Sequence, residues 1–100
     1  MSMDVGIPKT AIKVIDFGPL PDATAKSVAH GLTQKQFENV VNHWCQIFNS
    51  ASNNKFMLPY LSTVATGNIT YALSDTSVTI TTGSNRSSLT AKVYIEYEID

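Results

Sequence analysis

The stretch AKVYIEYEI, residues 91–99, decides the fold class, because its apolar and polar residues alternate along its whole length. Successive side chains of a β-strand point to opposite faces, so this alternation predicts a strand with one buried and one solvated face. The residues predicted to face the core are Ala91, Val93, Ile95, Tyr97 and Ile99. The residues predicted to face solvent are Lys92, Tyr94, Glu96 and Glu98. Strands of this kind are typical of antiparallel sheets, so the sequence predicts a mainly β protein.

Shorter segments with strand character precede that stretch. The segments 11–17, 68–73 and 78–82 are rich in β-branched residues or alternate in the same way. A weaker strand over 25–32 stops at Gly31. The sequence therefore predicts an antiparallel β-sandwich, jelly-roll-like, over residues 11–100, and an N-terminal arm over residues 1–10. The segment KFMLPYLSTV, which contains a proline, can form only a short or edge strand.

The middle of the chain admits two interpretations. In TQKQFENVVNHWCQIFNS, residues 33–50, the apolar residues follow the i, i+3, i+4, i+7 spacing of an amphipathic helix. Thr33 and Gln36 add the T-x-x-Q pattern of a helix capping box. The β-branched residues Val40 and Val41 and the neighbouring asparagines oppose a helix, because their helix propensity is low. A single helix at 34–49 and a strand both remain open.

Composition and charge narrow the class of protein. The 100 residues fit one domain, and the charged fraction of 15% is well below the usual value of about 25%. The net charge is −1 and the seven basic residues form no run, which argues against nucleic-acid or anionic-membrane partners. No apolar run approaches the roughly 18 residues of a membrane span. The first ten residues lack the apolar region of a signal peptide, so we expect synthesis in the cytoplasm.

The stretch TTGSNRSSLTAK, residues 81–92, lies between the last two predicted strands. A phosphate-binding loop would need the pattern G-x-x-x-x-G-K-[ST] before a helix, and this stretch has one glycine and leads into a strand. Gly83, Ser84 and Asn85 are turn formers. We therefore expect a hairpin loop here, with a polar contact loop at the tip of the domain as the alternative.

The residues that could carry catalysis or bind a metal are few. His43 and Cys45 would share a face of a strand, but a structural zinc site needs four ligands, and no further ligand has suitable spacing. Cys45 has apolar neighbours and is expected to be a buried structural thiol, and His30 is the only other histidine. We therefore predict no enzyme activity, no metal and no cofactor. The aspartates expected to form caps or turns are Asp16, Asp22 and Asp75.

Three aromatic residues are candidates for stacking on a sugar: Trp44, Tyr60 and Tyr94. We expect Trp44 in the core because its neighbours are apolar. Tyr94 belongs to the polar face of the last strand and is the better candidate for a contact.

Three stretches in the same order support a resemblance to a known family. They are VIDFGPLPDATAKSVAHGL (14–32), FMLPY (56–60) and VTITTGSNRSSLTAKVYIEYE (78–98). They resemble the conserved segments of a family of tailed-bacteriophage virion modules, often found at the C-terminal ends of tail-fibre, baseplate or other minor structural proteins. The resemblance implies a mainly β module in which 40–48 forms a strand. It also makes TGSNRSS a recurrent loop, with Arg86 bonded to a carboxylate or to backbone carbonyls.

The resemblance further implies a function. We expect a virion structural protein, made in the host cytoplasm, that acts as an adsorption module at the tail or fibre tip. The alternative is a capsid-decorating or connector protein that binds no receptor. The expected partners are copies of the same chain in a homotrimer, other virion proteins, and a host-surface glycan or protein. The residues expected to make the contact are Asn85, Arg86, Ser87 and Tyr94.

Overall fold

The computed structural model describes residues 9–58 and 67–99, and these residues form seven strands and one short helix. The elements are β1 (Lys9–Pro19), β2 (Ala25–Ala29), α1 (Gln34–Glu38), β3 (Val40–Asn49), β4 (Asn54–Met57), β5 (Ile69–Leu73), β6 (Ser77–Thr82) and β7 (Leu89–Ile99). Every strand pairing is antiparallel. The predicted mainly β class is thereby confirmed.

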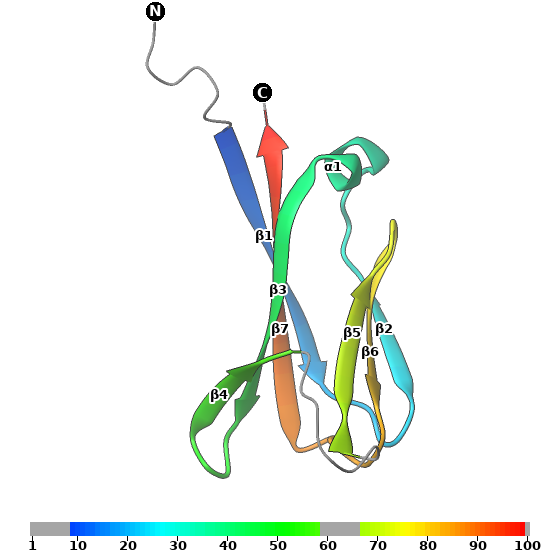
Figure 1. Cartoon of the computed structure of the whole chain (residues 1–100), viewed down its shortest axis with the longest axis vertical. Helices are drawn as coiled ribbons and strands as arrows, with labels where there is room; N and C mark the ends of the chain where they lie inside the picture. The colour runs from blue at the N-terminus through cyan, green and yellow to red at the C-terminus, as the bar shows by residue number, and fades with distance from the viewer. Residues whose placement is uncertain (1–8, 59–66, 100) are drawn as a thin grey trace, which may run out of the picture.

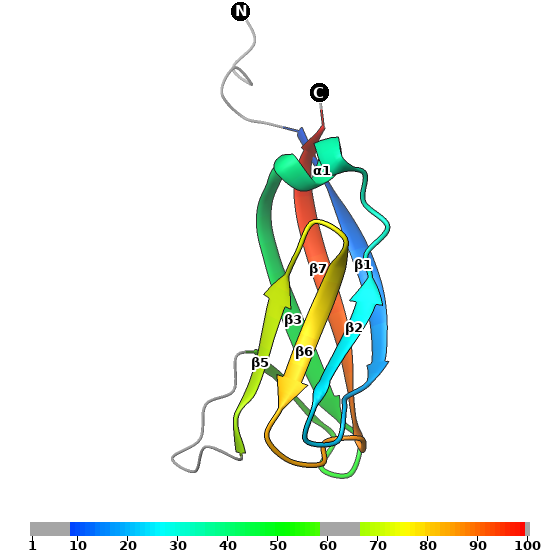
Figure 2. The ribbon, with the colours of Figure 1, turned by 90° about the vertical axis from the view of Figure 1, so that its right-hand side faces the viewer.

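The strands form two sheets that face each other, as Figures 1 and 2 show. One sheet has four strands in the order β1-β7-β3-β4, and the other has three in the order β2-β6-β5. β1 pairs with β7 and β2 pairs with β6, so strands from the start of the chain pair with strands from its end in nested order. This nested pairing is the jelly-roll-like sandwich that the sequence predicts.

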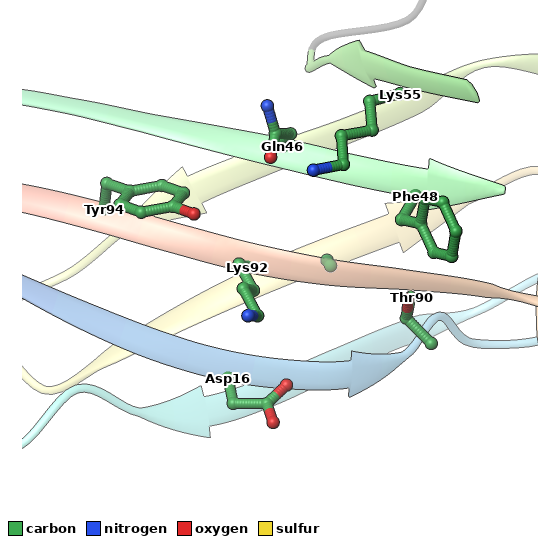
Figure 3. Close-up of a pocket in the computed structure, with 8 residues that line it drawn as sticks. Asp16, Gln46, Phe48, Lys55, Thr90, Lys92 and Tyr94 are labelled. Atoms are coloured by element: carbon green, nitrogen blue, oxygen red, sulfur yellow. The ribbon is translucent and has the colours of Figure 1, made fainter. Parts of the chain in front are cut away.

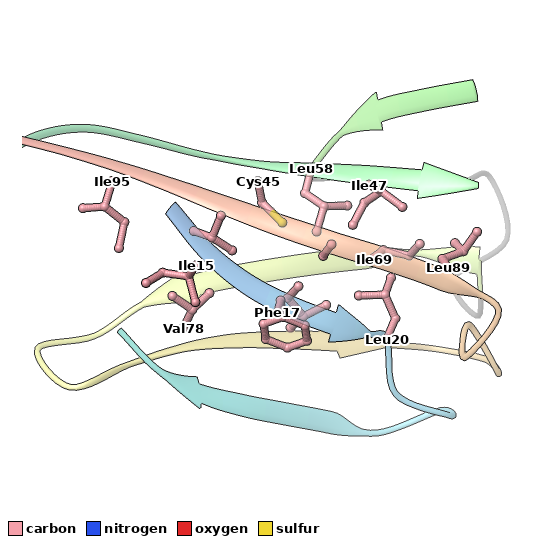
Figure 4. Close-up of a cluster of buried hydrophobic side chains, with 13 residues drawn as sticks. Ile15, Phe17, Leu20, Cys45, Ile47, Leu58, Ile69, Val78, Leu89 and Ile95 are labelled. Atoms are coloured by element: carbon pink, nitrogen blue, oxygen red, sulfur yellow. The ribbon is translucent and has the colours of Figure 1, made fainter. Parts of the chain in front are cut away.

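A single apolar core fills the space between the sheets (Figure 4). Fully buried side chains from β3, β5, β6 and β7 interdigitate there, as two sheet faces packed about 10 Å apart require. The buried cluster comprises Ile15, Phe17, Leu20, Cys45, Ile47, Leu58, Ile69, Val78, Ile80, Leu89, Ala91, Val93 and Ile95.

The alternation of β7 is confirmed over most of the strand and fails at its end. Ala91, Val93 and Ile95 are buried between the sheets. Tyr97 is half-buried and Ile99 is 46% exposed, so the prediction that Ile99 faces the core is wrong. The physical reason is length: β7 has eleven residues, whereas the strands of the three-stranded sheet have five or six, which cannot cover its far end.

The segment 34–49 begins as a short helix and continues as a strand. The capping box is confirmed, since the Thr33 hydroxyl accepts from the Gln36 amide (3.2 Å) and the Thr33 amide donates to the Gln36 side chain (2.9 Å). The helix lasts only five residues and ends at the C-cap Asn39. A helix over the whole of 34–49 is therefore wrong, and β3 takes most of the segment.

The helix-like spacing of apolar residues in this segment arises from a β-bulge and from apolar residues on both faces of β3. The register of β3 against β7 shifts between Val40 and Asn42, so Val41 is an extra residue and is 51% exposed. Beyond the bulge, strand alternation is regular, with Cys45 and Ile47 buried. The inserted residue lengthens the spacing of residues on one face from two to three at the bulge, and beyond it apolar side chains lie on both faces, with Ile47 inward and Trp44 and Phe48 outward. Together these positions match a helical stripe by chance.

Two element boundaries differ from prediction. The first strand begins at Lys9, which pairs with Ile99, so residues 9–10 belong to the sheet and not to the predicted arm. Residues 1–8 lie outside the described residues. β2 ends at Ala29, before the positive-φ turn at Gly31. The predicted edge strand near Pro59 is β4, and the part of that segment from Pro59 onward lies outside the described residues.

The stretch 81–92 is not a hairpin loop. β6 belongs to the three-stranded sheet and β7 to the four-stranded sheet, so the chain crosses from one sheet to the other between Thr82 and Leu89. The hairpin prediction is wrong because turn-forming residues indicate a change of direction without indicating which strand becomes the next neighbour. The crossing fixes how the two sheets stack at this end of the sandwich.

Candidate functional site

The crossing between β6 and β7 is bonded to the loop between β1 and β2. Asp22 forms an isolated β-bridge with Asn85. The Ala23 amide donates to the Ser84 carbonyl (3.0 Å), and the Arg86 amide donates to the Pro21 carbonyl (3.1 Å). The segments GPLPDAT and TGSNRSS, which belong to the stretches 14–32 and 78–98, therefore lie side by side and are joined by hydrogen bonds.

Within this junction the predicted contact residues have structural bonds. The Arg86 guanidinium donates from Nη2 to the Gly67 carbonyl at 2.9 Å, as expected for a residue that binds backbone carbonyls. The Asn85 side chain accepts from the Ser87 amide (3.0 Å) and closes an Asx-turn. Asn85 and Ser87 remain exposed and Arg86 is half-buried. The geometry gives Arg86 a structural role and leaves the other two side chains at the surface.

His30 is a buried histidine whose two ring nitrogens both form hydrogen bonds within the fold. Its side chain is 1% exposed, Nδ1 accepts from the Leu32 amide (3.0 Å), and Nε2 donates to the Ser74 carbonyl (2.9 Å). With both ring nitrogens bonded, His30 joins β2 to the β5–β6 turn and has no free nitrogen for acid–base chemistry.

His43 and Cys45 do face the same side of β3, as predicted, and they have separate structural roles. His43 Nδ1 forms a 2.8 Å hydrogen bond with the Tyr71 hydroxyl, and this bond connects β3 of one sheet to β5 of the other. Cys45 is fully buried, and burial raises the pKa of its thiol to about 12. The thiol therefore stays protonated at neutral pH and is not an activated nucleophile.

The outer face of the four-stranded sheet carries the most distinctive surface. We use the name outer face for the side of this sheet that points away from the core. Three of its apolar side chains are about half exposed: Ile12 at 53%, Val14 at 52% and Met57 at 47%. The register also brings aromatic and charged side chains from β1, β3, β4 and β7 together on this face.

Trp44 and Tyr94 are stacked on the outer face. They are directly opposite each other on β3 and β7, with ring centroids 5.3 Å apart and planes 10° from parallel. The expectation that Trp44 lies in the core is wrong: the bulge at Val41 sets the register so that Cys45 and Ile47 point inward and Trp44 outward. Tyr94 lies on the solvated face, as predicted.

A groove of about 370 Å³ begins beside Tyr94 and extends along the outer face toward Phe48 (Figure 3). Its volume is at the lower end of the range of small-ligand sites. Three polar residues lie in one cross-strand row along its floor: Gln46 on β3, Lys92 on β7 and Asp16 on β1. The groove is lined by Asp16, Gln46, Phe48, Lys55, Thr90, Ala91, Lys92 and Tyr94.

The polar side chains of the groove are available to a ligand. Among the described residues, the side chains of Gln46, Lys55 and Lys92 have no hydrogen bond or ion pair, and the same holds for Asp16 and Thr90. Some other polar side chains of this sheet are paired, as in the 2.7 Å bond between Thr10 and Glu96. A cluster of unpaired donors and acceptors beside two aromatic rings can bind a polar ligand without first breaking internal bonds.

The structure divides the four predicted contact residues between two places. Tyr94 lines the groove of the outer face, whereas Asn85 and Arg86 line a different depression near Asn49 and Asn54. Ser87 lies in the exposed part of the crossing. Tyr60, the third aromatic candidate, lies outside the described residues.

Sequence reasoning missed most of the groove. Lys92 was predicted to share a face with Tyr94, which is correct. Asp16 was expected in a cap or turn, but it lies within β1 and faces the groove. Gln46 and Phe48 could have been found only by reading β3 as a strand, and Lys55 only by knowing that β4 pairs with β3.

Comparison of the chain with protein-family models, with curated proteins and with solved structures finds no match. Within residues 9–58 and 67–99, no group of three or more histidine, cysteine or acidic side chains is placed to hold a metal ion. In the same residues no helix has the length and apolar character needed to cross a membrane.

Proposed function

We propose that this protein is a structural component of a bacteriophage virion and serves as an adsorption module at the tail or fibre tip. The proposal starts from the resemblance of residues 14–32, 56–60 and 78–98 to tailed-phage virion modules. The antiparallel sandwich is compatible with such a module, and the two longest matching stretches meet in one junction. The proposed form is a homotrimer in the virion, synthesised in the host cytoplasm.

The observation that carries the adsorption role is the outer face of the four-stranded sheet. It presents aromatic rings on β3 and β7, the two central strands of the sheet, and polar side chains without a partner among the described residues. The paired strands lower the entropy cost of binding, because their backbone is already ordered when the ligand arrives. A non-catalytic role also agrees with His30, whose two ring nitrogens are both bonded within the fold.

Competition with phage adsorption tests this function. Purified protein is added to cells of the host strain, and the rate at which phage particles disappear from the supernatant is measured. We expect the protein to slow adsorption in a dose-dependent way, and we expect Tyr94→Ala to weaken that effect. The control is Lys35→Ala, which removes an exposed lysine of α1 on another part of the surface. Failure of the wild-type protein both to bind cells and to slow adsorption would exclude the adsorption role.

A second candidate is a connector or capsid-decorating protein without a receptor. The observation that favours it is the exposure of Ile12, Val14 and Met57 on the outer face, since such apolar side chains are commonly buried against a partner. Labelling intact particles with an antibody against this chain separates the two roles, because a decorating protein would be found on the shell and an adsorption module on the tail. The native mass in dilute solution adds to this test: three chains support the trimeric module, and one chain supports a connector that needs its neighbours.

A further inference from the structure

The groove of the outer face combines two aromatic ends with a polar floor. Tyr94 and Phe48 belong to different cross-strand rows of the outer face, and the row that contains Lys92 lies between these two rows. The row of Phe48 meets β7 at Thr90, four positions before Tyr94. The two rows are therefore roughly 13 Å apart at the usual rise per residue. Figure 3 shows both rings at the ends of the groove with the polar side chains between them. A ligand that fits this space is short, with one apolar surface and many polar groups.

The polar floor offers both donors and acceptors. In the row across the sheet, Gln46 supplies an amide that donates and accepts, Lys92 an ammonium that donates, and Asp16 a carboxylate that accepts. A sugar has the complementary pattern, because each of its hydroxyls both donates and accepts. The C–H face of a pyranose ring packs against the face of an aromatic ring, whose π electrons carry partial negative charge.

The charge of the groove selects among sugars. Lys55 and Lys92 contribute two positive charges and Asp16 one negative charge, so the lining has an excess of one positive charge. Glu96, the next acidic residue along β7, does not line the groove and accepts a hydrogen bond from Thr10 at 2.7 Å. A ligand with a single carboxylate would balance this excess, whereas a phosphate with two negative charges would leave the site with a net negative charge.

We propose that the groove binds an acidic saccharide, that is, a sugar unit bearing a carboxylate, such as a uronic or sialic acid. The sugar ring stacks on Tyr94, its carboxylate binds the ammonium groups of Lys92 and Lys55, and its hydroxyls bond Gln46 and Asp16. This inference deepens the adsorption role and rests on it, since it names the class of host-surface glycan that the outer face recognises.

The test is titration of the intact chain with sialyllactose and, in a parallel sample, with lactose at the same concentrations. The shifts of the backbone amides are followed by NMR. The two sugars differ only in the acidic unit. We expect sialyllactose to bind at least about tenfold more tightly than lactose and to shift the amides of residues 46–48 and 90–94. Digalacturonate in place of sialyllactose distinguishes a uronic acid from a sialic acid as the source of the carboxylate.

Matched variants show whether this groove is responsible. Lys92→Ala and Tyr94→Ala should each weaken binding about tenfold, while Lys92→Arg and Tyr94→Phe retain most of it. Lys35→Ala should leave binding unchanged. The spectra also show that each variant is folded, so a loss of binding is not confused with unfolding.

Three outcomes would overturn the inference: no acidic saccharide binds, lactose binds equally well, or a triglutamate peptide binds as tightly as sialyllactose. A variant series in which Lys92→Ala and Tyr94→Ala have no effect would overturn it as well. Failure of the adsorption role is a different result, because a protein that binds sialyllactose but neither binds cells nor slows adsorption retains the saccharide site. A protein that slows adsorption but binds no acidic saccharide retains the adsorption role alone.

Discussion

The two sheets of the sandwich share one core and present very different outer surfaces. On the side of the three-stranded sheet that points away from the core, no side chain is larger than threonine: Ala25, Ser27, Ala29, Thr70, Ala72, Ser77, Thr79 and Thr81. The outer face of the four-stranded sheet carries Trp44, Phe48, Lys55, Lys92 and Tyr94. Both surfaces belong to regular antiparallel strands, so the strands alone do not account for the difference.

Side-chain length decides which of the two surfaces encloses a groove. Short hydroxyl side chains reach each other across strands, as in the 2.7 Å bond between Ser27 and Thr79, and they leave a shallow surface. Long side chains on the outer face extend past the backbone and enclose a groove between the rings of Tyr94 and Phe48. The polar groups of that groove have no partners among the described residues.

The largest expected effect separates the inner side of β7 from its outer side. Ile95 is fully buried, so Ile95→Ala should lower the free energy of unfolding by roughly 2–5 kcal/mol through lost burial and a residual cavity. The neighbouring outward substitution Lys92→Ala should change stability by no more than about 0.5 kcal/mol. Urea unfolding of both variants checks this. Equal losses of stability would contradict the distinction between a buried inner side and an exposed outer side of β7.

A second prediction concerns the inner side of β3, directly beneath Trp44 and Gln46. Burial raises the pKa of the Cys45 thiol from 9.0 to about 12, so the folded state keeps this proton at pH values where the unfolded chain loses it. The resulting stabilisation is complete below pH 9 and is lost as the pH rises toward 12, with a slope of at most about 1.4 kcal/mol per pH unit.

The check is the pH dependence of unfolding for Cys45→Val beside the wild type. Lysines and the other tyrosines contribute equally to both proteins, whereas the pKa of Tyr71 is raised by burial and by Cys45, so the difference between the two curves reports the thiol together with its effect on Tyr71. We expect the wild type to lose more stability than the variant between pH 9 and 11, and parallel curves would contradict a buried, protonated Cys45. Sugar binding by the variant should be unchanged, because the thiol points away from the groove.

A third prediction sharpens the outer face itself. The stacked rings of Trp44 and Tyr94 should couple by about 0.5–1.5 kcal/mol in a double-mutant cycle on stability. The cycle uses Trp44→Ala, Tyr94→Ala and the double variant, each measured by denaturant unfolding. Strict additivity would mean that the rings are held by the sheet alone and do not support each other.

The smallest effect is expected on the opposite sheet. Thr79→Ala removes the cross-strand bond to Ser27 and should cost about 0.2–1 kcal/mol, in line with Thr–Ser pairs at exposed sites. Its binding to sialyllactose and its effect on phage adsorption should equal those of the wild type. A loss of binding in Thr79→Ala would show that the small-residue surface takes part in recognition and would remove the contrast between the two surfaces.

The class of the fold and several local features could be predicted from the amino-acid sequence. Period-two alternation identified β7 and its solvated side with Tyr94, and the capping box at Thr33 and Gln36 located the start of α1. These features depend on neighbouring residues and on the intrinsic geometry of strands and helix ends, so they can be read from a short window. The burial of Cys45 was expected for a similar reason, since its neighbours are apolar.

The direction of Trp44, the path of the chain after β6 and the groove depend on the tertiary structure. The bulge at Val41 turned Trp44 outward, and the crossing from β6 to β7 replaced the expected hairpin. The groove exists because β1, β3, β4 and β7 bring residues as distant in sequence as Asp16 and Lys92 into one row. Which strands become neighbours depends on the packing of two whole sheets around a common core, and no local pattern contains that information.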